Sequence, residues 1–185
     1  MKTDLRDYIK IYNVIDEQMC NETVKQLDVA EWSKHTYHNP TEEKLISYDD
    51  DLSVSNDRIS NKMELMDKTW NCFRNYLNEL DMEWYFSWQA HSEIRFNRYD
   101  VNTQMRIHCD HIHTLFDGQQ KGIPVMSALG ILNDDYEGGE FLMFGDEKID
   151  LRKGDIMVFP SNFLYPHLVK PVTSGVRYSF VSWAW

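Results

Sequence analysis

The feature that most constrains the fold of this chain is a change of pattern near Leu80. Beyond that residue, short apolar runs alternate with turn signals as far as Trp185. Segments of this kind are typical of an all-β barrel or sandwich. We therefore predict strands at residues 86–90, 93–99, 105–109, 125–132, 140–144, 155–159, 167–169 and 176–185, with turns at 134–135, 138–139, 153–155 and 173–175.

The first half of the chain predicts a mixed α/β layer. Residues 9–14 alternate like a first strand, and Asp16 stands where it can cap a short helix. Residues 33–57 are polar and predict an exposed loop with short strands, whose acidic run at 49–51 we interpret as solvated. Apolar side chains at helical spacing predict a long helix over 57–80 that packs on the core.

Composition limits the class of protein. The 185 residues are 42% hydrophobic and 14% aromatic, enough for one sizeable core, and no flexible linker divides them. We expect a single domain, 1–185, in which residues 1–85 support a core made by residues 86–185. The net charge of −11 and the pI of about 5.0 argue against a nonspecific nucleic-acid binder and against binding to an anionic membrane surface.

The cysteines and the apolar segments indicate a compartment. Cys20, Cys72 and Cys109 are an odd and scattered set, which does not suit the paired disulfides of a small secreted protein. The sequence shows no apolar leader segment and no run of about 18 apolar residues. These features predict a cytoplasmic protein.

A short motif in the predicted β core suggests a metal site. His108 and Asp110 flank Cys109, and alternate side chains of a strand share a face, so both would point into the barrel while Cys109 points away. His167, from a distant strand, would complete a set of two imidazoles and one carboxylate. This set suits Fe(II) and leaves coordination positions open for oxygen and a chelating co-substrate.

The other histidines offer weaker alternatives. His111 and His113 could form the His-x-His pair of a cupin-like site, but they run into a polar loop and fit surface histidines better. His35, His38 and His91 have no partner at ligand spacing. We interpret these three as loop or hydrogen-bonded core histidines, unless the loop that carries the first two folds over the barrel mouth.

Arg177 suggests a binding site for a second carboxylate. It follows His167 by ten residues, and Ser179 shares its face two residues on. A guanidinium can hold a carboxylate with two parallel hydrogen bonds, and the hydroxyl can add a third. The pair suits the distal carboxylate of 2-oxoglutarate, whose keto-acid end would chelate the metal. Taken alone, Arg177 fits a surface salt bridge at the barrel edge equally well; its place after His167 favours the co-substrate.

Longer motifs carry a family resemblance. They are Tyr-Glu-Gly-Gly-Glu-Phe at 136–141, Leu-Arg-Lys-Gly-Asp-Ile-Met-Val-Phe-Pro-Ser at 151–161, Leu-Tyr-Pro-His at 164–167 and Val-Lys-Pro-Val-Thr-Ser-Gly-Val-Arg-Tyr-Ser at 169–179, followed by Trp183. Over about residues 90–185 the chain resembles the prolyl 4-hydroxylase-like branch of the Fe(II)/2-oxoglutarate oxygenases, especially bacterial hydroxylases with a Gly-Gly-Glu turn. The start of the chain resembles that family's opening strand and helix more loosely.

The resemblance implies a fold and a set of site residues. The fold is mainly β with flanking α-helices: a double-stranded β-helix, that is a jelly-roll or cupin-like barrel, on an N-terminal α/β support layer. The resemblance also implies that His108, Asp110 and His167 bind Fe(II) as the catalytic centre and that Arg177 binds 2-oxoglutarate. Tyr99 matches a tyrosine that this family often places near the co-substrate.

Two positions depart from the family pattern. Met105 and Ile131 stand where tyrosines are often found. Ser179, Tyr99 or Asn97 would then supply the missing hydrogen bonds to 2-oxoglutarate, because a buried carboxylate that is left partly unpaired is costly.

The function implied by the resemblance is that of a dioxygenase. It would use O2 and 2-oxoglutarate to hydroxylate a C–H bond, with succinate and CO2 as products and ascorbate as a candidate reductant. The implied substrate is a prolyl residue in a peptide or protein, selected by variable loops at 33–57 and 111–124.

Three alternatives remain at this point. The substrate could be a free amino acid or another small metabolite. It could be alkylated nucleic acid, since Asn97-Arg98-Tyr99 resembles a motif of such repair enzymes, although the acidic pI argues against it. Outside the enzymes, a non-catalytic β-barrel binding module is the alternative, and the intact ligand set argues against it. The sequence leaves the oligomeric state open.

Overall fold

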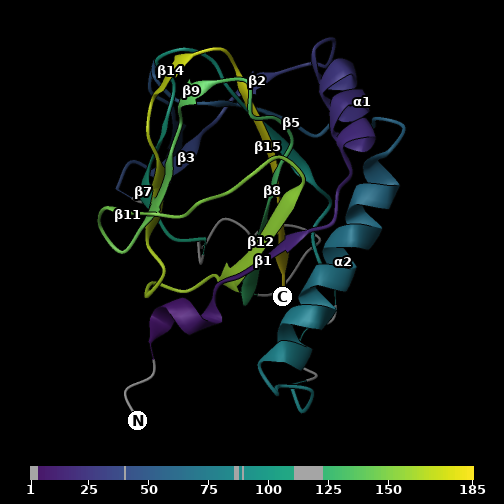
Figure 1. The fold of residues 1–185 in the computed structure, drawn as a ribbon. Helices are drawn as coiled ribbons and strands as arrows, with labels where there is room; N and C mark the ends of the chain where they lie inside the picture. Colours follow the sequence, from purple (N-terminus) through teal and green to yellow (C-terminus); the bar gives the residue numbers. More distant parts are fainter. Residues whose placement is uncertain (1–3, 40, 86–87, 89, 111–122) are drawn as a thin grey trace.

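A computed structural model of the chain describes residues 4–39, 41–85, 88, 90–110 and 123–185. The described chain is mostly antiparallel β-structure, with two α-helices on one side (Figure 1). The predicted mainly β fold with flanking helices is confirmed. The helical elements are η1 (Leu5–Tyr8, a 3-10 turn), α1 (Glu17–Leu27) and α2 (Lys62–Glu79). The strands are β1 (Lys10–Asn13), β2 (Ser33–Lys34), β3 (Tyr37–Asn39), β4 (Lys44–Ile46), β5 (Ser53–Ser55), β6 (Arg95–Tyr99), β7 (Met105–His108), β8 (Met126–Ile131), β9 (Glu137–Gly138), β10 (Phe141–Met143), β11 (Glu147–Lys148), β12 (Asp155–Pro160), β13 (His167–Val169), β14 (Val172–Ser174) and β15 (Arg177–Ala184).

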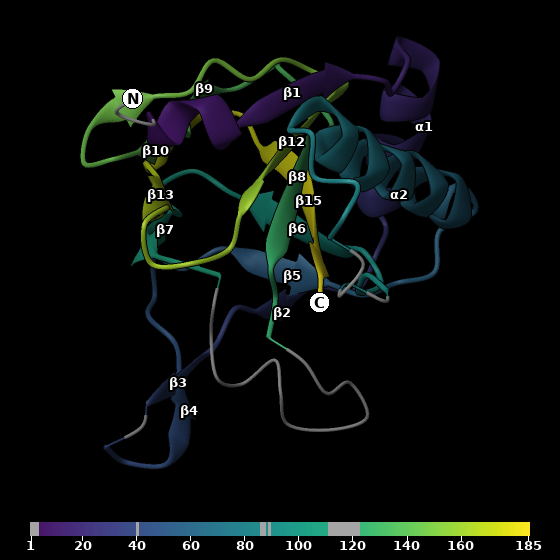
Figure 2. The same ribbon diagram turned by 90° about the horizontal axis from the view of Figure 1, so that it is seen from below.

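The described strands pair into two main sheets. The larger has seven strands in the order β1-β12-β8-β15-β6-β5-β2, and the smaller has four in the order β11-β10-β13-β7. Two ribbons, β14 with β9 and β3 with β4, complete the pairing. All pairs between these strands are antiparallel. The β3–β4 ribbon extends away from the body of the molecule, on the same side as β5 and β2 (Figure 2).

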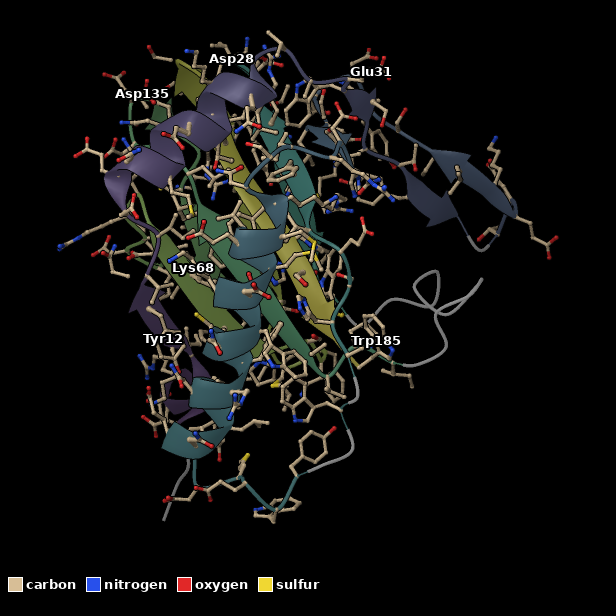
Figure 3. All side chains as sticks on the ribbon, turned by 90° about the vertical axis from the view of Figure 1, so that its right-hand side faces the viewer. Tyr12, Asp28, Glu31, Lys68, Asp135 and Trp185 are labelled. Carbon is tan, nitrogen blue, oxygen red and sulfur yellow. The ribbon has the colours of Figure 1, made fainter. Side chains whose placement is uncertain are left out.

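Side-chain alternation in the large sheet creates two cores. In β12, Ile156 and Val158 join the core formed with the helices, whereas Met157 and Phe159 join the core that also includes residues of the small sheet. Alternate residues of a strand point to opposite faces, so a strand buried on both faces is apolar throughout. Figure 3 views the molecule from the helix side, with α2 lying across the strands of the large sheet. The second core, between the sheets, surrounds the candidate site.

The two helices begin differently from one another. Asp16 caps α1 as predicted, since its Oδ1 accepts a hydrogen bond from the Met19 backbone N–H at 2.8 Å. The long helix begins at Lys62 rather than at Asp57. The Asp57 carboxylate instead accepts a hydrogen bond from the Glu31 backbone N–H at 2.7 Å, and this tertiary contact holds Asp57 outside the helix.

The predicted strand boundaries hold within one or two residues for the strands that line the barrel. Most of the strand predicted at 86–90 lies outside the described residues. Residues 173–174 were predicted as a turn but belong to β14, and Gly138 belongs to β9. These two short strands pair with each other across a shifted register, so neither shows the alternation that reveals a longer strand.

Residues 33–57 are more structured than the predicted exposed loop. They contain β2, β3, β4 and β5, and β5 pairs with β6 at the edge of the large sheet. Polar strands of two or three residues carry no periodic signal long enough to predict. None of the described helices combines the length and apolar character that a membrane-spanning helix needs.

Candidate metal and co-substrate site

Three side chains converge at the inner face of the small sheet. His108 ends β7 and pairs in register with His167, the first residue of β13. Asp110 lies in a bend two residues beyond the end of β7, so the strand predicted through Cys109 ends one residue early. The Asp110 Oδ1 atom is 3.5 Å from His108 Nε2 and 3.7 Å from His167 Nε2. Within the described residues, this group of three has ligand atoms all within 4.8 Å of one another, as a single metal ion requires.

Backbone carbonyls orient both imidazoles. The His108 Nδ1–H donates to the Arg106 carbonyl at 2.8 Å, and the His167 Nδ1–H donates to the Tyr165 carbonyl at 3.0 Å. A carbonyl oxygen only accepts, so each Nδ1 carries the proton and each Nε2 keeps a free lone pair. This arrangement fixes the tautomer that binds a metal through Nε2.

The protonation states match those of a ligand set. Burial lowers the pKa of His167 to about 4, which keeps the ring neutral at physiological pH. Burial alone would raise the pKa of Asp110, but electrostatic attraction to the neighbouring imidazoles of His167 and His108 holds it below its ordinary value, so the carboxylate is ionised. Phe141 and Phe159 each contact the His167 ring with centroids 5.2 Å apart. Two neutral nitrogens and one carboxylate in an apolar wall fit Fe(II).

Arg177 is buried rather than paired at the surface. Its side chain is 1% exposed, and its guanidinium lies over the rings of Tyr99, at 5.0 Å, and Tyr136, at 6.0 Å. Nη1 donates to Ser179 Oγ at 3.0 Å, while Nε is buried with no hydrogen-bond partner. The surface salt bridge at the barrel edge, weighed above, is therefore wrong. A buried guanidinium that lacks an anion is costly, and the arrangement fits a carboxylate-binding site.

The Gly-Gly turn before β10 makes room for this arginine. Gly138 and Gly139 have φ values of +72° and +65°, which side-chain-bearing residues rarely adopt. A β-carbon on Gly139 would lie 3.0 Å from Arg177 Cδ, and one on Gly138 would lie 2.4 Å from the Pro171 carbonyl oxygen. The Gly-Gly-Glu motif thus has a local reason in the packing around Arg177.

A small cavity of about 30 Å³ lies beside the three converging side chains. Of the predicted site residues, His108, Asp110 and His167 line it, together with Asn97 and Tyr99. The remaining two, Arg177 and Ser179, are buried beside it on β15, in register with Tyr99 and Asn97 of β6. The structure therefore brings all seven predicted residues to one place, although it assigns no ligand to them.

The two positions that depart from the family pattern are both buried near Tyr99. Met105 and Ile131 belong to the same core cluster as that tyrosine. A hydroxyl does reach Met105, from Tyr37 in β3, whose Oη lies 3.3 Å from Met105 Sδ and 3.2 Å from Asp51 Oδ1. The polar character missing at position 105 is thus partly supplied by the N-terminal half of the chain.

The acidic run at 49–51 is not a solvated loop throughout. Arg106 donates to Asp50 and Asp51, with N···O distances of 2.5 Å in both cases, and Asp51 is 1% exposed. The Arg106 guanidinium also lies 4.1 Å from the Tyr48 ring centroid. Because the Arg106 carbonyl holds His108, this cluster anchors the strand that carries the first metal-ligand candidate.

The other histidines differ in burial and in hydrogen bonding. His91 Nδ1 lies 2.9 Å from Ser182 Oγ, as expected for a hydrogen-bonded core histidine. His35 is buried against Tyr37, its Nδ1 has no partner, and burial lowers its pKa to about 3. His111 and His113 lie outside the described residues, as does the side chain of His38.

Two cavity residues were missed by the sequence interpretation. Arg95 and Trp183 line the cavity, and the Arg95 guanidinium lies 5.1 Å from the Trp183 ring centroid. Both could have been found by the alternation that identified the others, since Arg95 shares a strand face with Asn97 and Tyr99.

The fold and the site together define a jelly-roll protein with a facial His-Asp-His set and a buried arginine, the architecture of a mononuclear non-haem iron oxygenase. The family model of the 2OG-Fe(II) oxygenase superfamily matches residues 94–185. The chain belongs to this superfamily and is similar to prolyl hydroxylases in fold, and the predicted jelly-roll fold class is confirmed.

Relatives and solved structures agree with this assignment. A PKHD-type hydroxylase from Stenotrophomonas maltophilia is 35% identical over 94 residues, which is 48% of this chain and 41% of that protein. One from Methylobacterium nodulans is 36% identical over 102 residues, with the same coverage. The chain thus covers about two fifths of the length of these relatives.

Solved structures share the fold at low sequence identity. A prolyl hydroxylase from Trichoplax adhaerens, in complex with a peptide fragment of hypoxia inducible factor, superposes with a TM-score of 0.71 at 16% identity, over 96% of this chain and 83% of that one. A viral collagen prolyl hydroxylase from Paramecium bursaria Chlorella virus-1, in complex with 2OG, gives 0.63 at 16% identity, over 96% and 94%.

Proposed function

We propose that this protein is an Fe(II)- and 2-oxoglutarate-dependent dioxygenase that hydroxylates a C–H bond. The observation that carries the proposal is the convergence of His108, Asp110 and His167 with both Nε2 atoms free and both Nδ1 atoms held by carbonyls. When bound, iron and 2-oxoglutarate supply the oxidising chemistry, and the co-substrate leaves as succinate and CO2. The three side chains would hold the metal on one face and leave the other open.

The co-substrate has a matching binding site. Arg177 would bind the distal carboxylate of 2-oxoglutarate with its unpaired Nε and a second guanidinium nitrogen, and Ser179 would add a hydroxyl. Tyr99 and Asn97 line the cavity together with the three metal-ligand candidates, and the Asn97 Oδ1 is a buried acceptor with no partner. The apolar wall around His167 limits access of water.

A prolyl residue in a peptide or protein is the substrate class that the relatives favour. Two of them carry the name PKHD-type hydroxylase, and one solved structure of the same fold holds a peptide. The net charge of −11 argues against an alkylated nucleic-acid substrate. The use of ascorbate as a reductant and a cytoplasmic location stay predictions.

The test is iron-dependent conversion of 2-oxoglutarate to succinate, with mass spectrometry of peptide and metabolite pools for the gain of one oxygen. His108→Ala should abolish both the conversion and Mn(II) binding measured by electron paramagnetic resonance. Cys109→Ala is the matched control from the same tripeptide and should bind Mn(II) like the wild type, because the cysteine is not in the converging group. Turnover that His108→Ala leaves unchanged, or a wild-type protein that binds neither metal nor 2-oxoglutarate, would refute the proposal.

A further inference from the structure

The cavity holds a cation that the proposed reaction does not use. Arg95 is the first residue of β6 and lines the cavity with Asn97 and Tyr99. Its Nε is buried with no hydrogen-bond partner, and within the described chain no carboxylate lies within ion-pair distance of its guanidinium. Burial lowers the pKa of Arg95, and attraction to Tyr99 and Asp110 offsets only part of this effect.

A second unpaired donor lies beside it. The Trp183 indole Nε1 is buried without a partner, and the guanidinium of Arg95 lies 5.1 Å from the Trp183 ring centroid. An indole N–H can only donate a hydrogen bond. Two orphan donors at one end of a cavity, one of them charged, call for an acceptor that carries negative charge.

The strand register separates Arg95 from the arginine that would bind 2-oxoglutarate. Across the β6–β15 ladder Arg177 pairs with Tyr99, and Arg95 pairs with Val181. Four residues separate the two positions on β6, or about 13 Å between α-carbons. The two carboxyl carbons of 2-oxoglutarate are joined by four bonds of about 1.5 Å, so they lie less than about 6 Å apart. On this spacing we expect that 2-oxoglutarate, with one end on Arg177 and the other on the metal, would not pair with Arg95.

The charges in the site lead to the same conclusion. Among the described residues that line the cavity, the charged side chains are Arg95 and Asp110. Asp110 and the dianion of 2-oxoglutarate together offset a divalent metal ion and Arg177. The single positive charge of Arg95 then has no counter-ion until the substrate binds. One positive charge is balanced by a substrate group with one negative charge, such as a carboxylate, better than by a phosphate dianion.

On these grounds we infer that the oxidised substrate carries a carboxylate, which Arg95 and Trp183 bind while the carbon to be hydroxylated lies over the metal. This inference rests on the proposed function and names the substrate class more closely. The carboxylate could be the main-chain terminus of a small molecule or an acidic side chain in a peptide; the chemistry of recognition is the same. Arg95 would thus determine specificity for an acidic substrate.

The test uses Mn(II) in the metal site with saturating 2-oxoglutarate and no oxygen. Paramagnetic relaxation of probe protons by Mn(II) is measured by NMR for two matched pairs. N-acetylglycine and N-acetylglycinamide represent a terminal carboxylate; the α-amides of N-acetyl-aspartate and N-acetyl-asparagine represent an acidic side chain. With the wild type, each acid should give the same proton relaxation at about one tenth of the concentration that its neutral partner needs. The pair with the larger difference between acid and amide identifies the source of the carboxylate.

Variants on one strand give the control. Arg95→Met should remove the preference for the acid, and Arg95→Lys, which keeps the charge without the planar pair of donors, should weaken it and carries the test if the methionine variant does not fold. Arg98→Met is the matched control, because Arg98 is on the same strand and pairs with Asp100 at 2.9 Å; it should behave like the wild type.

Two results would overturn the inference while leaving the proposed function intact. One is an equal response to acid and amide in the wild type. The other is an acid preference that survives in both Arg95 variants, which would indicate direct coordination of the probe to Mn(II). Failure of the wild type to bind Mn(II) and 2-oxoglutarate in the same samples would instead remove the proposed function and this inference with it.

Discussion

The replacement of Arg177 by methionine separates an anion-binding arginine from a structural one. Methionine keeps much of the buried volume and removes the charge. The guanidinium makes one side-chain hydrogen bond, to Ser179, and stacks on Tyr99 and Tyr136, while its Nε is unpaired. A structural arginine in such a position would be expected to have its donors paired.

The expected magnitudes follow from these contacts. An unpaired buried donor costs about 1–3 kcal/mol, whereas the stacking and the single hydrogen bond contribute about 2 kcal/mol together. These effects nearly cancel, so Arg177→Met should change the free energy of unfolding of the metal-free protein by less than about 1 kcal/mol. Loss of the partner of a buried carboxylate costs about 3 kcal/mol, so the Kd for 2-oxoglutarate should rise roughly 150-fold.

The assay compares two measurements on the same samples. Urea unfolding followed by circular dichroism gives the free energy of unfolding, and isothermal titration calorimetry with Mn(II) gives the Kd for 2-oxoglutarate. Ser179→Ala serves as the milder companion change, because it removes one hydroxyl and keeps the charge. A loss of about 3 kcal/mol in stability together with an unchanged Kd would refute the assignment of Arg177 to the co-substrate.

Three further changes test other parts of the structure. Burial lowers the pKa of His35 to about 3, so below about pH 6.5 the unfolded chain binds a proton that the folded chain does not. Between pH 7 and pH 5 this proton should lower the free energy of unfolding by about 2 kcal/mol. In urea unfolding, His35→Gln should lose about 2 kcal/mol less than the wild type over the same pH range, and equal losses would contradict this. Gly139→Ala should lower the free energy of unfolding by about 1–3 kcal/mol and weaken 2-oxoglutarate binding. Gly145→Ala should lower only the free energy of unfolding, because Gly145 has φ +98° but open space for a β-carbon. Equal Kd values of the two variants for 2-oxoglutarate in calorimetry would contradict this. Asp51→Asn leaves Arg106 with half of its ion pair and should lower the thermal midpoint by an amount equivalent to about 2–3 kcal/mol, and an unchanged midpoint would contradict the anchoring role.

The sequence predicted the barrel strands because their alternation is local. In β12 and β15 each side chain meets one of two apolar cores, and a run of such residues can be recognised without knowledge of its neighbours. The same alternation selected His108 and Asp110, although Asp110 lies in a bend beyond the end of β7. The predicted residues therefore lie close together, whereas the strand geometry assumed for Asp110 was only approximate.

Long-range pairing explains what the sequence could not predict. The acidic run at 49–51 looks solvated until Arg106 is placed beside it, and nothing in the local sequence links positions so far apart. The late start of α2 has the same origin, since Asp57 is held by the backbone of Glu31. Polar residues are the least predictable by pattern because their partners, rather than their periodicity, decide whether they are buried.

The β6–β15 ladder shows how one strand pair can divide a cavity between two carboxylates. Tyr99 stands opposite Arg177 at one end, and Arg95 stands beside Trp183 at the other. Both arginines have a buried and unpaired Nε, and strand register keeps them about 13 Å apart at the backbone. Since a sheet position is fixed by many hydrogen bonds, the spacing does not relax when the cavity is empty. If each arginine binds one carboxylate, the ladder sets the position of the substrate relative to the co-substrate. A substrate whose reactive carbon lies at the wrong distance from its carboxylate would then bind without being hydroxylated.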